Sequence, residues 1–350
     1  MNQSHVSNKA KYTEGKNMAA KDTEQETSGT IIPVEHFDKA EDVKALYEAT
    51  VARLGTNEDV IIDILAKRTN SQRQDIIEAF VSTYDKELLD VMKSELSGDF
   101  LRVVEGLLDE PAVFLAKNIH SYATDTSMYQ TSDLALRLLE IIFPLNYLET
   151  SYVKEAYQQV FGSTLDADIS LNVFGPWKTI LLNVEMGQRH ETTCIDSYKV
   201  DQDIQFLVET PVDEWALPNA RMEDMLIRNS VEHLRKVFKG VKKSMSEKGI
   251  DIIQAINDST LTTEQKDGFS AIVSMCTDYV RFNATVLRKA MAGLGTDDDT
   301  LIRVIVARCE IDLENIKLEF QKMCGKSLRD WISSDTSGNY RDILLAIIGD

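Results

Sequence analysis

Near the end of the chain, the segment Met291–Asp298 reads M-A-G-L-G-T-D-D and places two glycines directly before a run of acidic residues. Glycine adopts backbone angles that other residues avoid, so such a loop can turn its carbonyl oxygens toward one point. Carbonyl and carboxylate oxygens are the ligands of hard cations, and calcium takes about six to eight of them at about 2.3–2.6 Å. The loop therefore predicts a site for a hard cation.

The same segment occurs a second time, 240 residues earlier. L-G-T-N-E-D at Leu54–Asp59 corresponds to L-G-T-D-D-D at Leu294–Asp299, and the apolar residues that follow keep the same spacing. Further on, S-E-L-S-G-D-F at Ser94–Phe100 corresponds to S-D-T-S-G-N-Y at Ser334–Tyr340. Self-similarity at a fixed offset is typical of repeat architectures, so we interpret these segments as one structural unit used twice.

An acidic residue stands at the same distance from each loop. Glu95 lies forty residues beyond Gly55, and Asp335 lies forty residues beyond Gly295. A single loop of this kind could merely end one helix and begin the next, but two copies with equally spaced acids favour a calcium site. Three carbonyls and one carboxylate supply about five oxygens, which leaves coordination positions open for another ligand.

Helices must bring each acid to its loop. Apolar residues at spacings of three and four predict helices throughout the repeated unit, and Thr56 and Thr296 fit as N-caps of the helix after the loop. In the first unit we expect helices near 40–53, 57–68, 71–82, 86–95 and 98–108. If the first and second helices open toward the same face as the fourth and fifth, the acids reach the loops.

The offset leaves room for two more helical units that lack the glycine loop. Their apolar spacing predicts helical stretches around Leu134–Ile142, Tyr152–Val160, Trp177–Val184, Ile204–Val208, Met222–Ile227 and Val231–Val241. The chain is thus expected to be all-α.

Composition excludes several classes of protein. The chain has 350 residues, of which 43% are hydrophobic, and no apolar run approaches the roughly 18 residues of a membrane span. The first thirty or so residues are polar and lack the apolar stretch of a signal peptide, and the four cysteines form no C-x-x-C pair, so we expect a cytoplasmic protein. The net charge of -19 argues against a nucleic-acid partner. It also opposes an anionic membrane unless a cation intervenes.

Other motifs that bind ligands or catalyse reactions are missing. The loop lacks the third glycine of a dinucleotide fold and the Lys-Ser/Thr of a P-loop, and its consecutive aspartates do not alternate as in an EF-hand. Neither H-E-x-x-H nor G-x-S-x-G occurs. We therefore predict a protein that is not an enzyme.

Over about residues 34–350 the chain resembles the annexin family. The match rests on M-A-G-L-G-T-D-D-D-T-L-I-R at Met291–Arg303, followed by D-T-S-G-N-Y-R at Asp335–Arg341. The resemblance implies four repeats of five helices each in a slightly curved disc. It places a disordered N-terminal tail at 1–33, repeats at 34–109 and 110–186, a linker with the third repeat at 187–278, and the fourth repeat at 279–350.

The resemblance also implies Ca²⁺ as the bound ion and residues that would hold it. In the fourth repeat these are the carbonyls of Met291, Gly293 and Gly295 and the carboxylate of Asp335. In the first repeat they are the carbonyls of Val51, Arg53 and Gly55 and the carboxylate of Glu95. Weaker accessory sites would combine the carbonyl of Thr296 with Asp298, and that of Thr56 with Glu58.

The first-repeat site departs from the family pattern at Arg53, which stands where the fourth repeat has Gly293. A left-handed backbone at an arginine costs roughly 1 kcal/mol or more, so we expect the fourth site to be the stronger. Repeat two has Asn172 in place of the acid, and repeat three has W-A-L-P from Trp215 in place of glycine and threonine. We expect both of these sites to be lost, with Trp215 exposed and able to reach lipid.

The implied function is calcium-dependent, peripheral binding to acidic phospholipid membranes, such as those containing phosphatidylserine. An alternative is an annexin-fold scaffold that binds the cytoskeleton with little dependence on lipid. In that case the N-terminal tail would dock a protein partner. Export by a non-classical route also stays open at this point.

Overall fold

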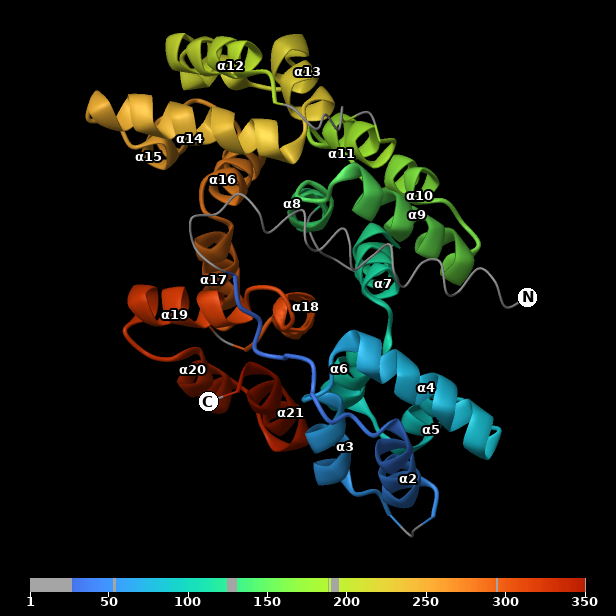
Figure 1. Cartoon of the computed structure of the whole chain (residues 1–350). Coiled ribbons are helices and arrows are strands. Elements are labelled where there is room, and N and C mark those ends of the chain that lie inside the picture. Colours follow the sequence, from blue (N-terminus) through green and yellow to red (C-terminus); the bar gives the residue numbers. More distant parts are fainter. Residues whose placement is uncertain are drawn as a thin grey trace. The chain divides into compact units, whose positions relative to one another are not determined.

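The computed structural model describes residues 27–52, 55–124, 131–187, 189, 195–293 and 295–349, with only the backbone for 131–133. The chain forms two compact units (Figure 1). Unit 1 runs up to Phe114 and resumes at Asn283, and unit 2 comprises Leu115–Phe282. Both copies of the glycine loop therefore belong to unit 1.

The helices of unit 1 come from the two ends of the chain. Each of the two repeats that carry the glycine loop contains five helices, in line with the apolar spacing. The first has α2 (Lys39–Thr50), α3 (Glu58–Leu65), α4 (Asn70–Tyr84), α5 (Leu88–Glu95) and α6 (Gly98–Leu108), and the fourth has α17 (Tyr279–Ala290, which begins in unit 2), α18 (Asp298–Arg308), α19 (Leu313–Cys324), α20 (Leu328–Asp335) and α21 (Gly338–Ile348).

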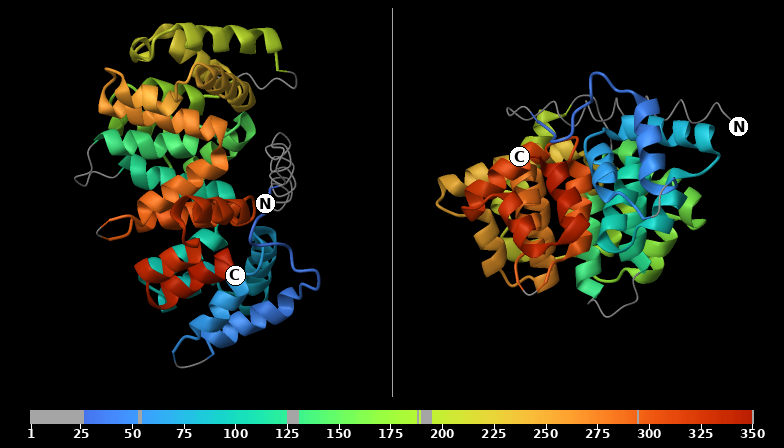
Figure 2. Two further views of the ribbon diagram at one scale, coloured as in Figure 1. Left: turned by 90° about the vertical axis from the view of Figure 1, so that its left-hand side faces the viewer. Right: turned by 90° about the horizontal axis from the view of Figure 1, so that it is seen from below.

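Unit 2 is also helical, and Figure 2 shows from two further sides that helices make up the described chain. In the described residues no strand occurs. Repeat two has α7 (Pro111–Thr124, which begins in unit 1), α8 (Thr131–Ile142), α9 (Tyr147–Phe161), α10 (Leu165–Asn172) and α11 (Lys178–Glu185), and repeat three has α12 (Ser197–Glu209), the 3₁₀ helix η1 (Val212–Trp215), α13 (Ala220–Arg228), α14 (Val231–Glu247), α15 (Ile252–Asp258) and α16 (Thr263–Thr277).

The core of unit 1 forms around α6 and α21, the fifth helices of their repeats. Helix α6 packs against α18 and α21, and α21 packs against α3. Their inward faces are fully buried at Val103, Leu107, Ile343 and Ile347. Burial of such side chains contributes about 1.5–3 kcal/mol each, so the two repeats stabilise one another directly.

The helices after the glycine loops begin one residue later than predicted. We expected Thr56 and Thr296 as N-caps, but the N-cap residues are Asn57 and Asp297. The carboxylate of Asp297 accepts a hydrogen bond from the backbone N–H of Thr300. An aspartate three residues before a helical N–H caps as well as a threonine, which leaves the threonine hydroxyls for other partners.

The chain before the first repeat is ordered over a longer stretch than predicted. We expected disorder through residue 33, yet the backbone N–H groups of Thr30 and Ile31 both donate to the carbonyl of Cys309, at 2.7 and 3.0 Å. Ile31 is buried, and Ser28 N donates to Asn315 Oδ1 at 2.8 Å. Residues 28–31 thus attach to the turn between α18 and α19. The remainder of the predicted tail, with its partner-docking role, lies in residues 1–26, outside the described residues.

The prediction that Trp215 is exposed is wrong. Its side chain has 0% relative exposure and packs edge-on against Phe269 of α16, with ring centroids 5.9 Å apart. Trp177 packs against the same ring at 5.0 Å. A large aromatic side chain buries more apolar area than any other, so unit 2 uses both tryptophans as core residues.

Candidate metal centre

The fourth-repeat loop connects α17 to α18 through two glycines in unusual backbone conformations. Gly293 has φ 127° and Gly295 has φ 86°. A Cβ atom at either position would meet nothing within 4 Å. Since space is free, the requirement for glycine comes from the backbone angle, which residues with a side chain rarely adopt.

Asp335, at the end of α20, lies beside this loop. The hydroxyl of Thr296 donates to Asp335 Oδ2 at 3.4 Å and lies at the same distance from the backbone carbonyl of that residue. The backbone N–H of Asp297 donates to the carbonyl of Ala290 at 2.8 Å, which closes the loop at its base. The chain thus brings together residues forty positions apart at one exposed rim.

The first-repeat loop has the same arrangement. Gly55 has φ 80°, and the Thr56 hydroxyl donates to Glu95 Oε2 at 2.9 Å. Glu95 ends α5 as Asp335 ends α20. Val51 follows α2, while Arg53 lies outside the described residues, so the expected strain at Arg53 stays a prediction.

The donor groups of both loops suit a hard cation. In the part of the chain that the structure describes, no hydrogen bond ends on the carbonyl oxygens of Val51, Gly55, Met291, Gly293 or Gly295. Each loop also has a solvent-exposed carboxylate, Glu95 or Asp335, within reach of its threonine. Backbone carbonyl and carboxylate oxygens are the ligands that calcium prefers. The residues present therefore fit the ion that the resemblance implies.

A metal site built from side chains alone would need several His, Cys, Asp or Glu residues close together. Over the described ranges, no three or more His, Cys, Asp or Glu side chains are grouped so that they could hold a metal ion. The predicted ligand sets are different in kind, because each combines backbone carbonyls with one carboxylate.

The two predicted accessory sites have different surroundings. In the fourth repeat, the Tyr340 hydroxyl donates to Asp298 Oδ1 at 2.8 Å, so one oxygen of the predicted ligand already has a partner. Burial raises the pKa of the Asp298 carboxyl, although the bond from Tyr340 opposes the shift. In the first repeat, Phe100 stands at the position corresponding to Tyr340 and has no hydroxyl to donate.

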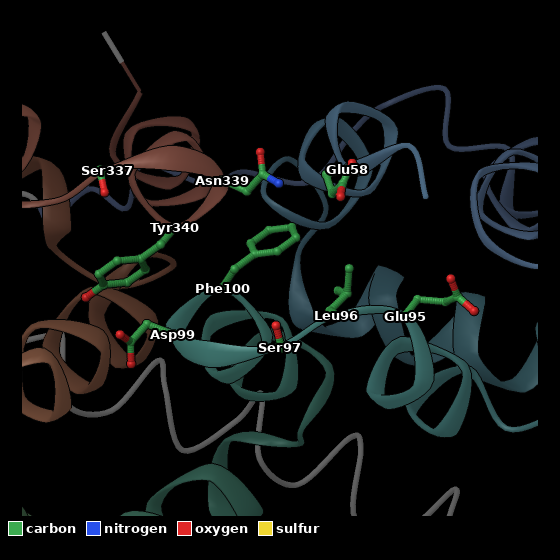
Figure 3. Close-up of a pocket in the computed structure, with 9 residues that line it drawn as sticks. All are labelled: Glu58, Glu95, Leu96, Ser97, Asp99, Phe100, Ser337, Asn339 and Tyr340. Carbon is green, nitrogen blue, oxygen red and sulfur yellow. The ribbon is translucent and has the colours of Figure 1, made fainter. Parts of the chain in front are cut away.

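Glu58 and Glu95 both line a cavity of about 350 Å³ where repeats one and four meet (Figure 3). Phe100 and Tyr340, which hold corresponding positions in the two repeats, both line this cavity. Asp99 also lines it and is paired with Arg102 at 2.6 Å.

Arg102 joins the two repeats, because it also pairs with Asp299 at the start of α18. Sequence reasoning did not identify Arg102, Asp99 or Tyr340 as part of the site. Their position in or just after the repeated S-G-D-F and S-G-N-Y segments was the signal that could have identified them.

In repeats two and three, different residues occupy the positions of the glycine loop and of its acid. Asn172 ends α10, and the segment that replaces the loop of repeat two falls largely in residues 125–130, outside the described residues. In repeat three, Asp213 accepts hydrogen bonds from the N–H and hydroxyl of Thr260, at 2.5 and 2.8 Å. These bonds lower the pKa of the Asp213 carboxyl. Asp258 ends α15 as Glu95 ends α5.

Comparison with known proteins identifies the family. The sequence model of the annexin family matches residues 41–107 and 282–347, which lie in the two repeats that keep the glycine loop. Annexin A13 of Mus musculus is 34% identical over 316 residues, which cover 89% of this chain and 95% of that protein. Annexin A4 of Homo sapiens is 35% identical over 325 residues, which cover 92% and 98%.

Solved structures agree with the sequence relatives. The structure of annexin III matches with a TM-score of 0.82 at 32% identity, covering 92% of this chain and 97% of that one. Calcium-bound annexin (Sm)1 matches with a TM-score of 0.79 at 27% identity, covering 93% and 94%. The all-α fold class expected from the sequence is confirmed.

Fold and loops together define a class of proteins that bind phospholipid membranes peripherally and in a calcium-dependent manner. This chain belongs to that class as a member of the annexin family. Annexins are in general not enzymes. Within the described part of the chain, no helix combines the length and apolarity needed to cross a bilayer.

Proposed function

We propose that this chain attaches to membranes containing acidic phospholipids, such as phosphatidylserine, through calcium held at the loops 51–57 and 291–297. The observation that carries the proposal is the pairing of each loop with an acid forty residues away. Thr56 bonds to Glu95, and Thr296 bonds to Asp335. A loop that only joined two helices would have no need of an acid beside it in both copies.

The chain's own groups would act as follows. Gly293 and Gly295 permit the backbone turn, the loop carbonyls supply neutral oxygens, and Asp335 supplies the negative charge. Calcium, when bound, carries two positive charges and has coordination positions that lipid phosphate oxygens can fill. One solved relative, annexin (Sm)1, is calcium-bound in its crystal structure, which supports this choice of ion.

Charge explains why the ion would be required. A chain of net charge -19 and an anionic surface repel one another within a Debye length, about 8 Å at physiological salt. Because the metal would be shared between protein and lipid, each should increase the affinity for the other, by reciprocal linkage. Calcium affinity should therefore be higher in the presence of vesicles than in solution.

The test is sedimentation with phosphatidylserine vesicles over a calcium titration. We expect pelleting that depends on calcium and is reversed by a chelator. Magnesium at equal concentration should substitute poorly, since it requires a tighter octahedral shell and gives up water reluctantly. Absence of calcium-dependent pelleting, or equal binding with magnesium, would contradict the proposal.

The alternative function, a cytoskeletal scaffold, makes the opposite prediction. It rests on the expected loss of calcium sites in repeats two and three, where Asn172 and W-A-L-P replace the usual residues. Filament co-sedimentation that persists after calcium is chelated, without vesicle binding, would favour it.

A further inference from the structure

The turn between α10 and α11 in repeat two occupies the place that carries the predicted calcium-binding acid in repeats one and four. Helix α11 packs against α8 and α10, just as α6 packs against α3 and α5. The turn glycines share a left-handed conformation, with φ 87° at Gly175, 60° at Gly98 and 59° at Gly338. The three turns are therefore structural equivalents.

The residues that these turns expose differ in chemistry. Repeat one reads Ser94-Glu-Leu-Ser97 and repeat four reads Ser334-Asp-Thr-Ser337, and all four serines are exposed. Repeat two reads Leu171-Asn-Val-Phe, so a leucine and a phenylalanine replace the two serines and an amide replaces the acid. The polar, anionic character of the turn is lost at every outward position.

Leu171 and Phe174 project into solvent to an unusual degree. Leu171 is 72% exposed and Phe174 is 56% exposed. Single exposed apolar residues are common, but two neighbours on one turn indicate a contact surface.

The turn is held firmly, so this exposure is not the result of fraying. Val173, between the two exposed residues, is buried, and Trp177 is fully buried beneath the turn. The indole N–H of Trp177 donates to the carbonyl of Glu264 at 3.0 Å. A Cβ atom on Gly268 would lie 2.1 Å from the Trp177 ring, so this close approach requires glycine. The core thus fixes the direction in which Leu171 and Phe174 point.

The charges around the turn suit the boundary between lipid headgroups and acyl chains. The ammonium of Lys178 lies 5.4 Å from the centre of the Phe174 ring and donates to the carbonyl of Ser170 at 2.6 Å. A cation beside an aromatic ring and an aliphatic side chain is typical of groups at a membrane interface. The carboxyl of Glu264 lies beside Gly175 and would oppose an anionic surface when ionised. Burial raises the pKa of this carboxyl.

We propose that the α10–α11 turn is a calcium-free membrane contact, in which Leu171 and Phe174 enter the acyl region while Lys178 stays at the phosphates. This inference rests on the proposed function, because it assigns repeat two an apolar contribution to the same membrane attachment. Repeats one and four would supply charge bridging, and repeat two would supply apolar burial in place of its missing acid.

The first test replaces both apolar residues by the serines that repeats one and four carry. In the L171S/F174S double variant we expect the calcium concentration for half-maximal vesicle binding to rise by about tenfold, because the apolar area of two large side chains is no longer buried. The matched control is Leu318→Ser, which removes a leucine that is 51% exposed within α19, a helix that forms none of these turns. It should bind like the wild type.

A second test measures directly whether position 174 enters the membrane. Phe174→Trp should lose fluorescence when vesicles contain brominated lipid, and only when calcium is present, after subtraction of the signal from the native tryptophans. Leu318→Trp should not respond. Circular dichroism and thermal unfolding would show that each variant is folded.

The outcomes separate the two proposals. If the wild type does not pellet with vesicles, the proposed function and this inference both fail. If the wild type pellets but the double variant binds equally well and Phe174→Trp is not quenched, only the inference is overturned. If the wild type self-associates without lipid and L171S/F174S does not, the turn binds a second copy of the chain, and the membrane assignment is wrong.

Discussion

Two carboxylates, Glu95 and Asp335, hold equivalent positions in the first and fourth repeats, and each can be neutralised with little change of shape. Asp335→Asn and Glu95→Gln both remove the charge and weaken bidentate coordination. The fourth loop has Gly293 where the first has Arg53, so we expect Asp335→Asn to raise the calcium needed for half-maximal vesicle binding more than Glu95→Gln. The double variant should nearly abolish binding. The measurement is vesicle binding over a calcium titration, made for the wild type, both single variants and the double variant.

Stability without calcium serves as the control for this series. Both acids are exposed, and substitutions at exposed positions usually change the free energy of unfolding by less than about 0.5 kcal/mol. A double variant that binds like the wild type would disprove the assignment of these loops. A larger effect from Glu95→Gln than from Asp335→Asn would disprove only the ranking.

The hydroxyl of Tyr340 offers a second test at single-residue scale. Tyr340→Phe removes the bond to Asp298 and leaves the ring, and Phe100 shows that the equivalent place accepts a phenylalanine. We expect a loss of about 1 kcal/mol in the free energy of unfolding, measured in urea. Tyr198→Phe is the control, since Tyr198 is 69% exposed. Equal stability of both variants would show that the bond contributes nothing.

Among the elements, the attachment of residues 28–31 to the α18–α19 turn depends on a glycine. A Cβ atom on Gly29 would lie 2.6 Å from the carbonyl oxygen of Cys309, and this neighbour is backbone that cannot rotate away. Gly29→Ala should therefore detach the segment and destabilise unit 1 by about 1–3 kcal/mol. Faster protease cleavage near residue 30 and a lower melting temperature would report the change.

Ser28→Ala is the matched control for this segment. The Ser28 hydroxyl donates only a long bond, 3.4 Å, to the neighbouring Gly29 carbonyl, and the backbone bonds of Ser28 are kept. We expect its melting temperature and cleavage rate to equal those of the wild type. If Gly29→Ala behaves in the same way, the segment is not closely packed.

Glu185, a buried acid at the end of α11, should make the stability of the fold depend on pH. Burial raises the pKa of the Glu185 carboxyl above its ordinary value of 4.5, and the ammonium of Lys154, 2.8 Å away, opposes the shift. Between the ordinary and the raised pKa, the folded protein holds a proton that the unfolded chain has released, so stability falls as pH rises through this window. Glu185→Gln removes the titrating group.

We therefore expect the stability of Glu185→Gln relative to the wild type to increase as pH rises from about 4.5 toward 7. Lys154 loses its partner in this variant, but its attraction to the ionised Glu185 is already included in the net upward shift of the pKa, so the sign of the slope is unchanged. Glu155→Gln on α9 is exposed and should show no such slope. A flat difference for Glu185→Gln would mean that Lys154 fully compensates the burial.

At this scale the sequence predicts some features and misses others for identifiable reasons. Apolar spacing located the helices of unit 1, because each must bury one face and the period of that face is visible. The N-caps shifted by one residue: in the first repeat the Thr56 hydroxyl bonds to Glu95, and Asn57, whose side chain makes no capping bond, holds the N-cap position. That contact joins residues thirty-nine positions apart and is invisible to local pattern reading.

Burial of single side chains was harder to predict than the helices. Trp215 was expected at the surface because it replaces a loop glycine, but the ring of Phe269 lies against it. The exposure of Leu171, near the end of α10, and of Phe174, just after it, was not predicted either. Local sequence shows that these residues are apolar, but not whether another part of the chain covers them.

For the whole molecule, the two units should respond differently to calcium. Both glycine loops lie in unit 1, whereas unit 2 has neither. Without lipid, calcium should therefore slow hydrogen exchange around residues 51–57, 95, 291–297 and 335, and should leave unit 2 unchanged, because a ligand stabilises the state to which it binds. With vesicles, protection should extend to the α10–α11 turn. Protection of unit 2 by calcium alone would contradict this division.

Unit 1 is built from two separate parts of the chain, and this affects how the protein folds during synthesis. Unit 2 is continuous in sequence, but unit 1 needs both its N-terminal part and residues from Asn283 onward. Synthesis proceeds from the N-terminus, and domains generally fold as units. The face of α6 that packs against α18 and α21 therefore stays uncovered until those two helices have been translated. During that interval α6 packs only against helices of its own repeat, such as α4 and α5, and the nascent chain exposes an apolar helix face that a chaperone can recognise.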